Sequence, residues 1–336
     1  MAVNRRFTLV SRPDGAPRPS DFRLVEEAVP VIGEGECLIR NHYISIDPAI
    51  RTWLNQEDTY MPAIAVGDAL RASTLGVVEA SNHPRLKVGD WVQGLNRIED
   101  YSVCGPDGAN GRVDVSRVPS PSAFLSVAGG TGLTAWFAVE EELQPKAGQM
   151  LLVSGAAGAV GSIIGQLARG RGARVVGIAG GPAKCARLVE RYGYDAAVDY
   201  KGKDVDALRA AIAQACPDGV DLLFENVGGI CLDAALLNIN QGGLVVVCGL
   251  ISEYNGEPYG TRQLIRLLMH SVAMRGYVLP KYAARLGEGR KALIDLVARG
   301  ELVYDEHVEE GMENVLPAFM RLFDGSNEGK MVVKLV

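Results

Sequence analysis

From about residue 149 to residue 278, short apolar runs alternate with amphipathic segments of helical length. Runs that are apolar throughout are typical of strands buried on both faces, and apolar positions three and four apart are typical of helices. The expected strands are Met150–Ser154, Arg174–Ile178, Ala196–Val198, Val220–Phe224, Leu244–Cys248 and Ala273–Val278. The expected helices are Ala159–Arg169, Ala183–Tyr192, Val205–Ala215, Ile230–Leu237 and Thr261–His270. This alternation predicts an α/β fold with a doubly wound parallel sheet.

The first 120 residues follow a different pattern, with little helical periodicity and many Pro, Gly and charged turns. Their strand candidates are Cys37–Ile44, Leu75–Ala80 and Trp91–Leu95. A last strand, Met331–Val336, is expected to return to this mostly β region. We therefore expect one domain from residues 1–121 and 300–336, and a second from residues 122–299. The length of 336 residues agrees, since a single domain usually has roughly 100–200.

The charge distribution argues for a small-molecule partner. The chain has 34 basic and 40 acidic residues spread along its whole length, with a net charge of -6. No basic patch for nucleic acid or for an anionic membrane surface stands out. Two uncharged stretches, 147–168 and 234–252, are long enough to resemble membrane spans, but the first contains five glycines and has the pattern of a strand, a turn and a helix.

The cysteines and the N-terminus indicate a reduced cytoplasm. The six cysteines are never closer than fifteen positions, so neither a disulfide framework nor a CxxC pair is present. The first fifteen residues lack the apolar core and the cleavage site of a signal peptide.

Glycine is the compositional outlier, at 40 of 336 residues. The most informative segment is a strand followed by Gly155-x-x-Gly158-x-x-Gly161 and then by a helix and a second strand. Glycines let the backbone turn tightly and approach a pyrophosphate, and the N-terminus of the following helix supplies N–H groups and a positive dipole. In this context the turn predicts a Rossmann-type dinucleotide site.

The second expected strand indicates which dinucleotide is bound. Sites for NAD usually carry an acidic residue at its end, about 20 residues after the turn, to bind the ribose hydroxyls. Here Ala179-Gly180-Gly181 follows instead, and Lys184 or Arg187 can neutralise a ribose 2′-phosphate. NADP(H) is therefore favoured, and a solvated Lys184 in the first turn of a helix is the alternative.

Seven motifs along nearly the whole chain resemble those of one family. They are YISIDPAIR (Tyr43–Arg51), VVEASNHPRLKVGDWV (Val77–Val92), GTGLTAWF (Gly130–Phe137), GAAGAVGS (Gly155–Ser162), FENVGG (Phe224–Gly229), CGLISEYN (Cys248–Asn255) and GSNEGKMVVK (Gly325–Lys334). The family is the medium-chain dehydrogenase/reductases, in the zinc-independent branch of prostaglandin reductases, plant alkenal double-bond reductases and curcumin-reductase-like enzymes. The resemblance implies a GroES-like first domain and a Rossmann second domain.

The resemblance further implies an NADPH-dependent reductase of the C=C bond of α,β-unsaturated aldehydes and ketones, which delivers a hydride to the β-carbon and protonates the enolate. The implied cofactor-binding residues are Gly155, Gly158, Ala159, Val160, Gly161, Lys184, Tyr200, Asn226, Cys248, Gly249, Leu250, Ile251, Ser252, Tyr254, Tyr277, Val278, Leu279 and Asn327. Lys184 and Tyr200 are expected at the adenosine phosphate, the glycine turn at the pyrophosphate and Asn226 near the ribose. Residues 248–254 are expected on the nicotinamide side and residues 277–279 at the carboxamide. Asn327 is expected to close over the cofactor. An interface tyrosine at 200, a core thiol at 248 and a turn-forming Asn327 are the alternatives.

No zinc site can be assembled from this sequence. Where zinc dehydrogenases of the superfamily have an early Cys, a Gly-His-Glu motif and a four-cysteine lobe, this chain has Ser45-Ile46-Asp47, Gly67-Asp68-Ala69 and the single Cys104. The four histidines, His42, His83, His270 and His307, lie in unrelated contexts. We therefore expect no bound metal.

The proton donor departs from the family pattern. The tyrosine common in the SxDPYMR motif is Ala49 here, and a second usual tyrosine aligns with Met269. Tyr254 in the SEYN turn is the first candidate for the catalytic hydroxyl, and Tyr60 in the loop EDTYMP is the second. The nicotinamide ribose hydroxyl is a further alternative. Asp47 and Arg51 either line the same cleft or form a structural ion pair.

Two other functions stay open beside enone reduction. Quinone reduction needs the same hydride delivery, and a non-catalytic NADPH-binding protein would also retain the glycine turn. We expect a homodimer, because the sixth strand would be an edge that can pair across a two-fold axis.

Overall fold

The computed structural model describes residues 3–336 and divides them into two units. Unit 1 contains the residues up to Gly130 together with Glu306–Val336, and unit 2 is Thr131–Asp305. The sequence-based domain boundaries, after residues 121 and 299, lie a few residues before the ends of these units and stay a prediction.

Unit 2 is built on a parallel sheet with the strand order β10-β9-β8-β11-β12-β13. The strands are β8 Met150–Ser154, β9 Arg174–Ala179, β10 Ala196–Asp199, β11 Val220–Glu225, β12 Ile239–Val247 and β13 Ala273–Gly276. The order runs outward from β8 to β10 and then reverses, so β8 and β11 lie side by side at the switch point. The predicted doubly wound sheet is therefore confirmed, with β10 and β13 as its edge strands.

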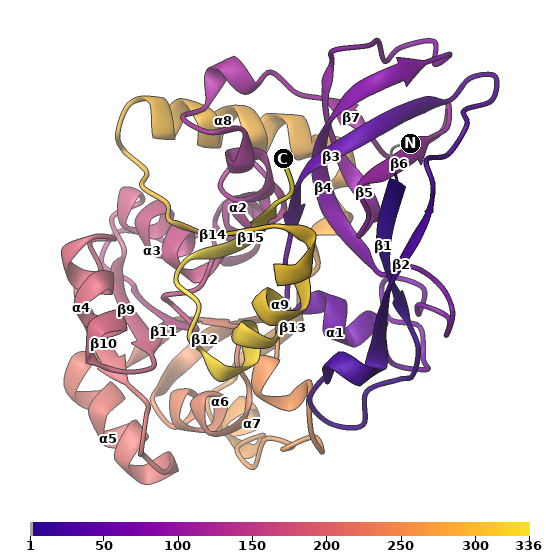
Figure 1. Ribbon diagram of the computed structural model, residues 1–336. Helices are drawn as coiled ribbons and strands as arrows, with labels where there is room; N and C mark the ends of the chain where they lie inside the picture. Colours follow the sequence, from indigo (N-terminus) through magenta and orange to yellow (C-terminus); the bar gives the residue numbers. More distant parts are fainter. Residues whose placement is uncertain (1–2) are drawn as a thin grey trace. The chain divides into compact units, whose positions relative to one another are not determined.

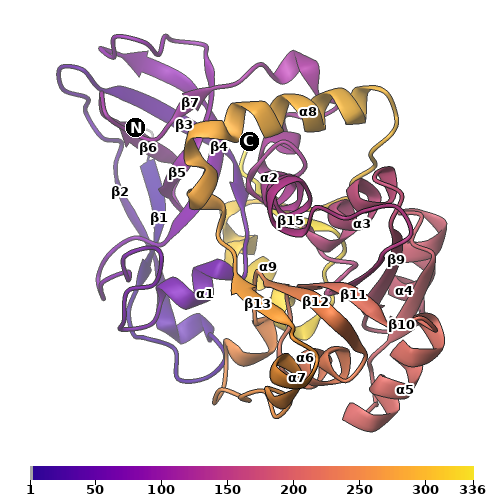
Figure 2. The ribbon, with the colours of Figure 1, turned by 180° about the vertical axis from the view of Figure 1, so that it is seen from behind.

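Helices cover both faces of this sheet, and Figure 2 shows α3 and α6 on opposite sides of it. The helices of this region are α2 Gly130–Phe137, α3 Gly161–Gly170, α4 Pro182–Glu190, α5 Val205–Ala215, α6 Gly229–Leu236, α7 Ile265–Met269 and α8 Leu286–Ala298. Leu152, Val176, Ile178, Leu223 and Val245 are among the buried side chains of the core. Complete burial of such a side chain contributes about 1.5–3 kcal/mol.

One predicted helix, Thr261–His270, was wrong over its first half. Only Ile265–Met269 is helical, because Thr261 and Arg262 are held by the carboxylate of Asp233 in α6. The Thr261 hydroxyl donates to Asp233 Oδ1 over 2.5 Å and the Arg262 N–H donates to it over 3.1 Å. These bonds to a distant residue replace the first turn of the expected helix.

The two uncharged stretches that resembled membrane spans are mixed structure. The first contains β8 and most of α3, and the second contains the end of α6 and all of β12. Among residues 3–336, no helix is both long enough and apolar enough to cross a membrane.

Unit 1 is mostly β structure (Figure 1). One sheet has the strand order β14-β15-β3-β4-β5-β7, with β6 also paired to β3, and β1 and β2 form a separate pair. The strands are β1 Val3–Leu9, β2 Phe22–Ala28, β3 Cys37–Ser45, β4 Arg71–Ser81, β5 Trp91–Arg97, β6 Tyr101–Cys104, β7 Gly111–Arg112, β14 Glu306–Glu310 and β15 Lys330–Lys334. Its α-helices within the described residues are α1 Ala49–Trp53 and α9 Val315–Asp324, beside several short 3₁₀ helices.

The C-terminal strand returns to the N-terminal sheet, as predicted. β15 pairs antiparallel with β3, placing Val332 opposite Ser45. It also pairs in parallel with β14, whose first residue is Glu306. The carboxylate of Glu306 accepts hydrogen bonds from the hydroxyls of Ser122, at 2.5 Å, and Ser126. The two places where the chain leaves and re-enters unit 1 are thus tied together within that unit.

Candidate dinucleotide site at the switch point of the sheet

The loops that follow β8, β11 and β12 are joined by hydrogen bonds at the carboxyl edge of the sheet. The side chain of Asn226 donates to the Ser154 carbonyl over 2.7 Å, and its backbone N–H donates to the Ser154 hydroxyl over 2.8 Å. The backbone N–H groups of Ile251 and Ser252 donate in turn to the carbonyls of Asn226 and Val227. Three predicted segments are therefore linked by hydrogen bonds at the edge of the sheet where doubly wound folds bind ligands.

A buried carboxylate that the sequence analysis missed organises these loops. Glu225, the last residue of β11, is fully buried. Its Oε1 accepts hydrogen bonds from the Ser154 hydroxyl at 2.6 Å and from the backbone N–H groups of Val227 and Gly228 at 2.6 and 2.8 Å. Its Oε2 has no partner among the described residues. Burial raises the pKa of Glu225, despite these donors. An acidic residue at the end of the apolar run VDLLF was the available signal.

The predicted glycine turn has the close contacts that require glycine. Gly155 has a φ of 57°, in the left-handed region. A Cβ on Gly161 would lie 2.6 Å from the Gly155 carbonyl oxygen. No side chain caps the N-terminus of α3 at Val160, and its first turn holds no acidic residue. The first N–H groups and the positive end of the helix dipole are therefore suited to a pyrophosphate.

Gly161 and Gly165 also fit the helix against Tyr194. The hydroxyl of Tyr194 donates to the Gly161 carbonyl over 2.6 Å, and a Cβ on Gly165 would lie 2.2 Å from the Tyr194 ring. Tyr194 is buried. Part of the glycine pattern thus serves helix packing rather than direct approach to a ligand.

The turn after β9 gathers the residues expected at the adenosine end. Lys184 lies in the first turn of α4, and this helix begins directly after Gly181, whose φ is 94°. A Cβ on Gly180 would lie 3.1 Å from the Tyr200 hydroxyl and 3.2 Å from Lys201 Cε. The structure therefore adds Lys201, which the sequence analysis did not select, to Tyr200 beside this turn. Two lysines in this region suit a phosphate group.

The loop after β12 contains the residues expected at the nicotinamide. The hydroxyl oxygen of Tyr254 accepts a hydrogen bond from the Leu250 N–H, and a Cβ on Gly249 would lie 3.2 Å from that oxygen. Burial raises the pKa of Tyr254. Burial also raises the pKa of Cys248 to about 12, so this side chain stays a neutral thiol.

The side chain of Tyr277 is bonded to α2, and the residues after it, Val278 and Leu279, follow the carboxyl end of β13. Its hydroxyl donates to the Thr134 carbonyl over 2.9 Å, and its N–H donates to the Val247 carbonyl over 2.9 Å. The ring is buried. The backbone of Val278 and Leu279, rather than the Tyr277 side chain, is therefore suited to contact a carboxamide.

The remaining candidates belong to unit 1. Tyr60 is 50% exposed, and the Asn327 side chain donates to the Gly329 carbonyl over 3.3 Å. Asp47 is 3.1 Å from the ammonium of buried Lys330. Arg51 donates to Asn55 and to the Gly15 carbonyl. Asp47 and Arg51, which the sequence left either as cleft residues or as an ion pair, thus each have a partner of another kind, and the Lys330 contact is one that the sequence did not predict.

The structure also shows where Ala49 and Met269 lie, the two residues that stand in place of the family tyrosines. Ala49 is the first residue of α1, and Met269 ends α7 with more than half of its surface exposed. Neither can donate a proton. No group of three or more His, Cys, Asp or Glu side chains that could hold a metal ion occurs within residues 3–336.

Comparison with known families matches both units. Residues 5–111 match the family described as the N-terminal domain of oxidoreductases. Residues 159–299 match the family described as zinc-binding dehydrogenases.

Comparison with individual proteins extends over the whole chain. The chain is 37% identical to the NADPH-dependent curcumin reductase of Escherichia coli, covering 99% of this chain and 97% of that one. It is 34% identical to the NADP⁺-dependent 2-alkenal reductase of Nicotiana tabacum, covering 98% and 97%. The crystal structure of CurA from Vibrio vulnificus in complex with NADPH superposes with a TM-score of 0.92 at 36% identity, covering 99% of both chains.

Proposed function

The chain belongs to the NADP-dependent oxidoreductases of the medium-chain dehydrogenase/reductase family, and we propose that it uses NADPH to reduce the C=C bond of α,β-unsaturated aldehydes and ketones. The observation that carries the proposal is the set of linked loops at the switch point, with the glycine turn at Gly155–Gly161 and lysines beside the turn after β9. Relatives that act on curcumin and on 2-alkenals support the choice of substrate.

The residues of unit 2 fit NADPH from end to end. Lys184, Tyr200 and Lys201 would bind the 2′-phosphate, the N-terminus of α3 the pyrophosphate, and the loop after β12 the nicotinamide side. Bound NADPH supplies a hydride to the β-carbon of the substrate. The protein must then orient the acceptor and stabilise the oxygen on which negative charge develops.

Tyr254 is our first candidate for the group that protonates the enolate. Its oxygen is already fixed as an acceptor by the Leu250 N–H, so the phenol proton is directed to another partner. Tyr60 of unit 1 is the second candidate, on the basis of its loop and its 50% exposure. The ribose hydroxyl of the cofactor is the remaining one.

One assay tests the proposed function. NADPH absorbance is followed with purified protein and a panel of alkenals, enones and quinones. Oxidation with the first two classes and formation of the saturated carbonyl product, checked by mass spectrometry, is the expected result. Turnover of quinones alone would show that the substrates are quinones rather than α,β-unsaturated aldehydes and ketones. Measurable NADPH binding without oxidation by any compound would favour the non-catalytic alternative and overturn the enzyme proposal.

We also propose that the protein is a homodimer paired through the edge of the unit 2 sheet. β13 has a free edge within the described residues. Beside it in the sequence, Leu264, Ile265, Leu268 and Met269 of the α7 region are each more than half exposed. A second copy related by a two-fold axis would cover this apolar surface. Light scattering should give twice the chain mass, and Leu268→Lys should weaken the dimer; a monomeric wild type would overturn this proposal.

The free cysteines support a reduced cytoplasmic location, which we propose on that basis. All six are unpaired thiols in the structure. Disulfides form and persist mainly in oxidising compartments.

A further inference from the structure

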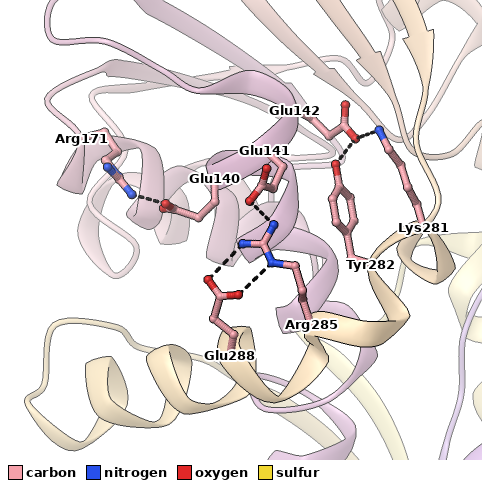
Figure 3. A network of polar contacts seen from close by, with 8 residues as sticks. All are labelled: Glu140, Glu141, Glu142, Arg171, Lys281, Tyr282, Arg285 and Glu288. Carbon is pink, nitrogen blue, oxygen red and sulfur yellow. Dashed lines mark hydrogen bonds and ion pairs between the residues drawn. The ribbon is translucent and has the colours of Figure 1, made fainter.

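Three consecutive glutamates, Glu140, Glu141 and Glu142, lie outside the contacts assigned to the cofactor. They occupy a π-helical turn, Ala138–Leu143, that continues α2. The turn ends at Gln144, whose φ of 45° is left-handed and whose N–H donates to the Val139 carbonyl. Turns of this kind are rare and occur frequently at functional sites. Figure 3 shows the three carboxylates directed to different partners, Glu140 to Arg171, Glu141 to Arg285, and Glu142 to Lys281 and Tyr282.

Glu142 is the buried member of this run. Only 2% of its surface is exposed. Its carboxylate lies 2.7 Å from Lys281 Nζ, 2.5 Å from the Tyr282 hydroxyl and 3.1 Å from Arg275 Nε. Burial alone would raise the pKa of Glu142, but the bonds from Lys281 and Tyr282 and the charge of Arg275 hold it below its usual value. Glu142 is therefore an ionised carboxylate surrounded by three donors.

The three donors bracket the segment expected at the nicotinamide carboxamide. Arg275 is in β13, and Lys281 and Tyr282 are in the 3₁₀ helix Leu279–Arg285. Residues 277–279 lie between them along the chain. Inside this bracket the Tyr277 hydroxyl is bonded to the Thr134 carbonyl of α2.

An aromatic stack holds the C-terminal end of this segment against α2. The Tyr282 ring is parallel to the Phe137 ring of α2, with centroids 4.6 Å apart and planes 5° apart. The Glu142 carboxylate and this stack hold Tyr282 by two different parts of its side chain. The segment after β13 is thus bound to α2 and its π turn at both of its ends.

The Glu142 carboxylate is buried, whereas Arg275 and Lys281 keep 47% and 58% of their side chains exposed. A buried carboxylate left without partners is costly, so the burial of Glu142 favours the arrangement in which its three donors stay in place. That arrangement sets the path of the backbone between Arg275 and Lys281.

We propose that Glu142 is a positioning residue for the nicotinamide, and that it acts by holding the backbone of Val278 and Leu279 in place through Arg275, Lys281 and Tyr282. This inference rests on the proposed function for the assignment of residues 277–279 to the carboxamide. The other two glutamates of the run do not share the role. Glu140 pairs with Arg171 after α3, and Glu141 pairs with Arg285 at the far end of the 3₁₀ helix.

A pair of charge-matched variants tests the proposal. Glu142→Gln and Glu140→Gln each remove one negative charge from the same π turn. Calorimetry measures the affinity of each variant for NADPH and for 2′-phospho-ADP-ribose, which lacks the nicotinamide. For Glu142→Gln we expect an about tenfold loss of NADPH affinity, corresponding to about one well-placed hydrogen bond, and no change for the nicotinamide-free ligand. Glu140→Gln should change neither affinity.

A second variant keeps the test valid if Glu142→Gln does not fold. Lys281 has 58% of its side chain exposed, so Lys281→Met removes one partner of Glu142 from the surface side and leaves the Arg275 pair. We expect a smaller loss of NADPH affinity than for Glu142→Gln, again without a change for the nicotinamide-free ligand. The fluorescence of bound NADPH, which reports on the nicotinamide ring, should also change.

Two results would overturn the inference. One is an equal loss of affinity for both ligands, which indicates general destabilisation, and the other is unchanged NADPH binding by a folded variant. The binding measurements need no substrate. If the wild type binds NADPH but reduces none of the tested acceptors, the proposed function is refuted and this binding test still holds.

Discussion

The hydroxyl oxygen of Tyr254 lies 3.3 Å from the backbone nitrogen of Leu250 and accepts its hydrogen bond. Both residues belong to the loop after β12, at the carboxyl edge of the sheet. Burial raises the pKa of Tyr254 above its usual value of 10.0, so the phenol keeps its proton at neutral pH. A protonated hydroxyl whose oxygen is already anchored is well arranged to donate to a developing enolate.

Tyr254→Phe should therefore lower kcat by about 10²-fold, the smaller end of the range for general acid catalysis. The affinity for NADPH should stay the same, because the phenol donates no bond on which cofactor binding depends. Steady-state kinetics and calorimetry measure the two quantities. Tyr60→Phe is the comparison: a loss of turnover there, with none for Tyr254→Phe, would move the role to Tyr60. Unchanged turnover in both variants would leave the ribose hydroxyl as donor.

Lys184→Ala should weaken NADPH binding by about tenfold, in the range of one charge-assisted hydrogen bond to a phosphate. The affinity for NADH, which lacks the 2′-phosphate, should not change. Lys201→Ala should act in the same direction, because Lys201 lies beside the same Gly180 turn. The ratio of the two dissociation constants is the measurement. A parallel loss of NADH affinity would argue that Lys184 supports the helix rather than the phosphate.

Glu225→Gln should gain stability relative to the wild type as the pH rises. The folded state raises the pKa of Glu225, so the stability that this carboxyl contributes is complete below its unfolded value of about 4.5 and is lost at higher pH. Glutamine keeps an acceptor for the Ser154, Val227 and Gly228 donors without a charge. Between that value and the raised pKa of the folded state, the difference in unfolding free energy should grow by up to about 1.4 kcal/mol per pH unit. Urea titrations at several pH values would contradict this if the difference shrank instead.

Gly165→Ala should destabilise the protein by about 1–3 kcal/mol through overpacking. The added methyl group would lie 2.2 Å from the ring of Tyr194, which is held by its bond to the Gly161 carbonyl. Gly170→Ala is the matched control in the same helix, since nothing lies within 4 Å of its Cβ position. Alanine there should be neutral or slightly stabilising. Equal urea midpoints for the two variants would show that Tyr194 moves aside freely.

The elements that the sequence predicted well are those specified by local pattern. β8 and α5 coincide with their expected ranges because a continuous apolar run and a 3.6-residue periodicity are complete within each segment. The glycine turn was equally visible, since its meaning depends only on the strand before it and the helix after it. The family resemblance then supplied roles that spacing alone does not contain.

The features that were missed depend on partners far away in the chain. Lys330 and Asp47 are separated by most of the sequence, and a buried lysine looks like any solvated one before its partner is known. The prediction of the first half of the helix Thr261–His270 was wrong for the same reason, because Asp233 binds the residues that would form its first turn. The run of three glutamates would read from sequence as a solvated face, and only the fold distinguishes Glu142 from its neighbours.

The hydrogen bonds from Ser122 and Ser126 to Glu306 join the two points at which unit 2 is inserted into the chain of unit 1. They close the base of a single long excursion of the polypeptide, Thr131–Asp305, which leaves the β unit and returns to it at adjacent points. Insertions of this kind are tolerated because the host needs only two neighbouring ends. We therefore expect that the excursion can be exchanged for a counterpart of different cofactor preference while the strand order of the host sheet is kept.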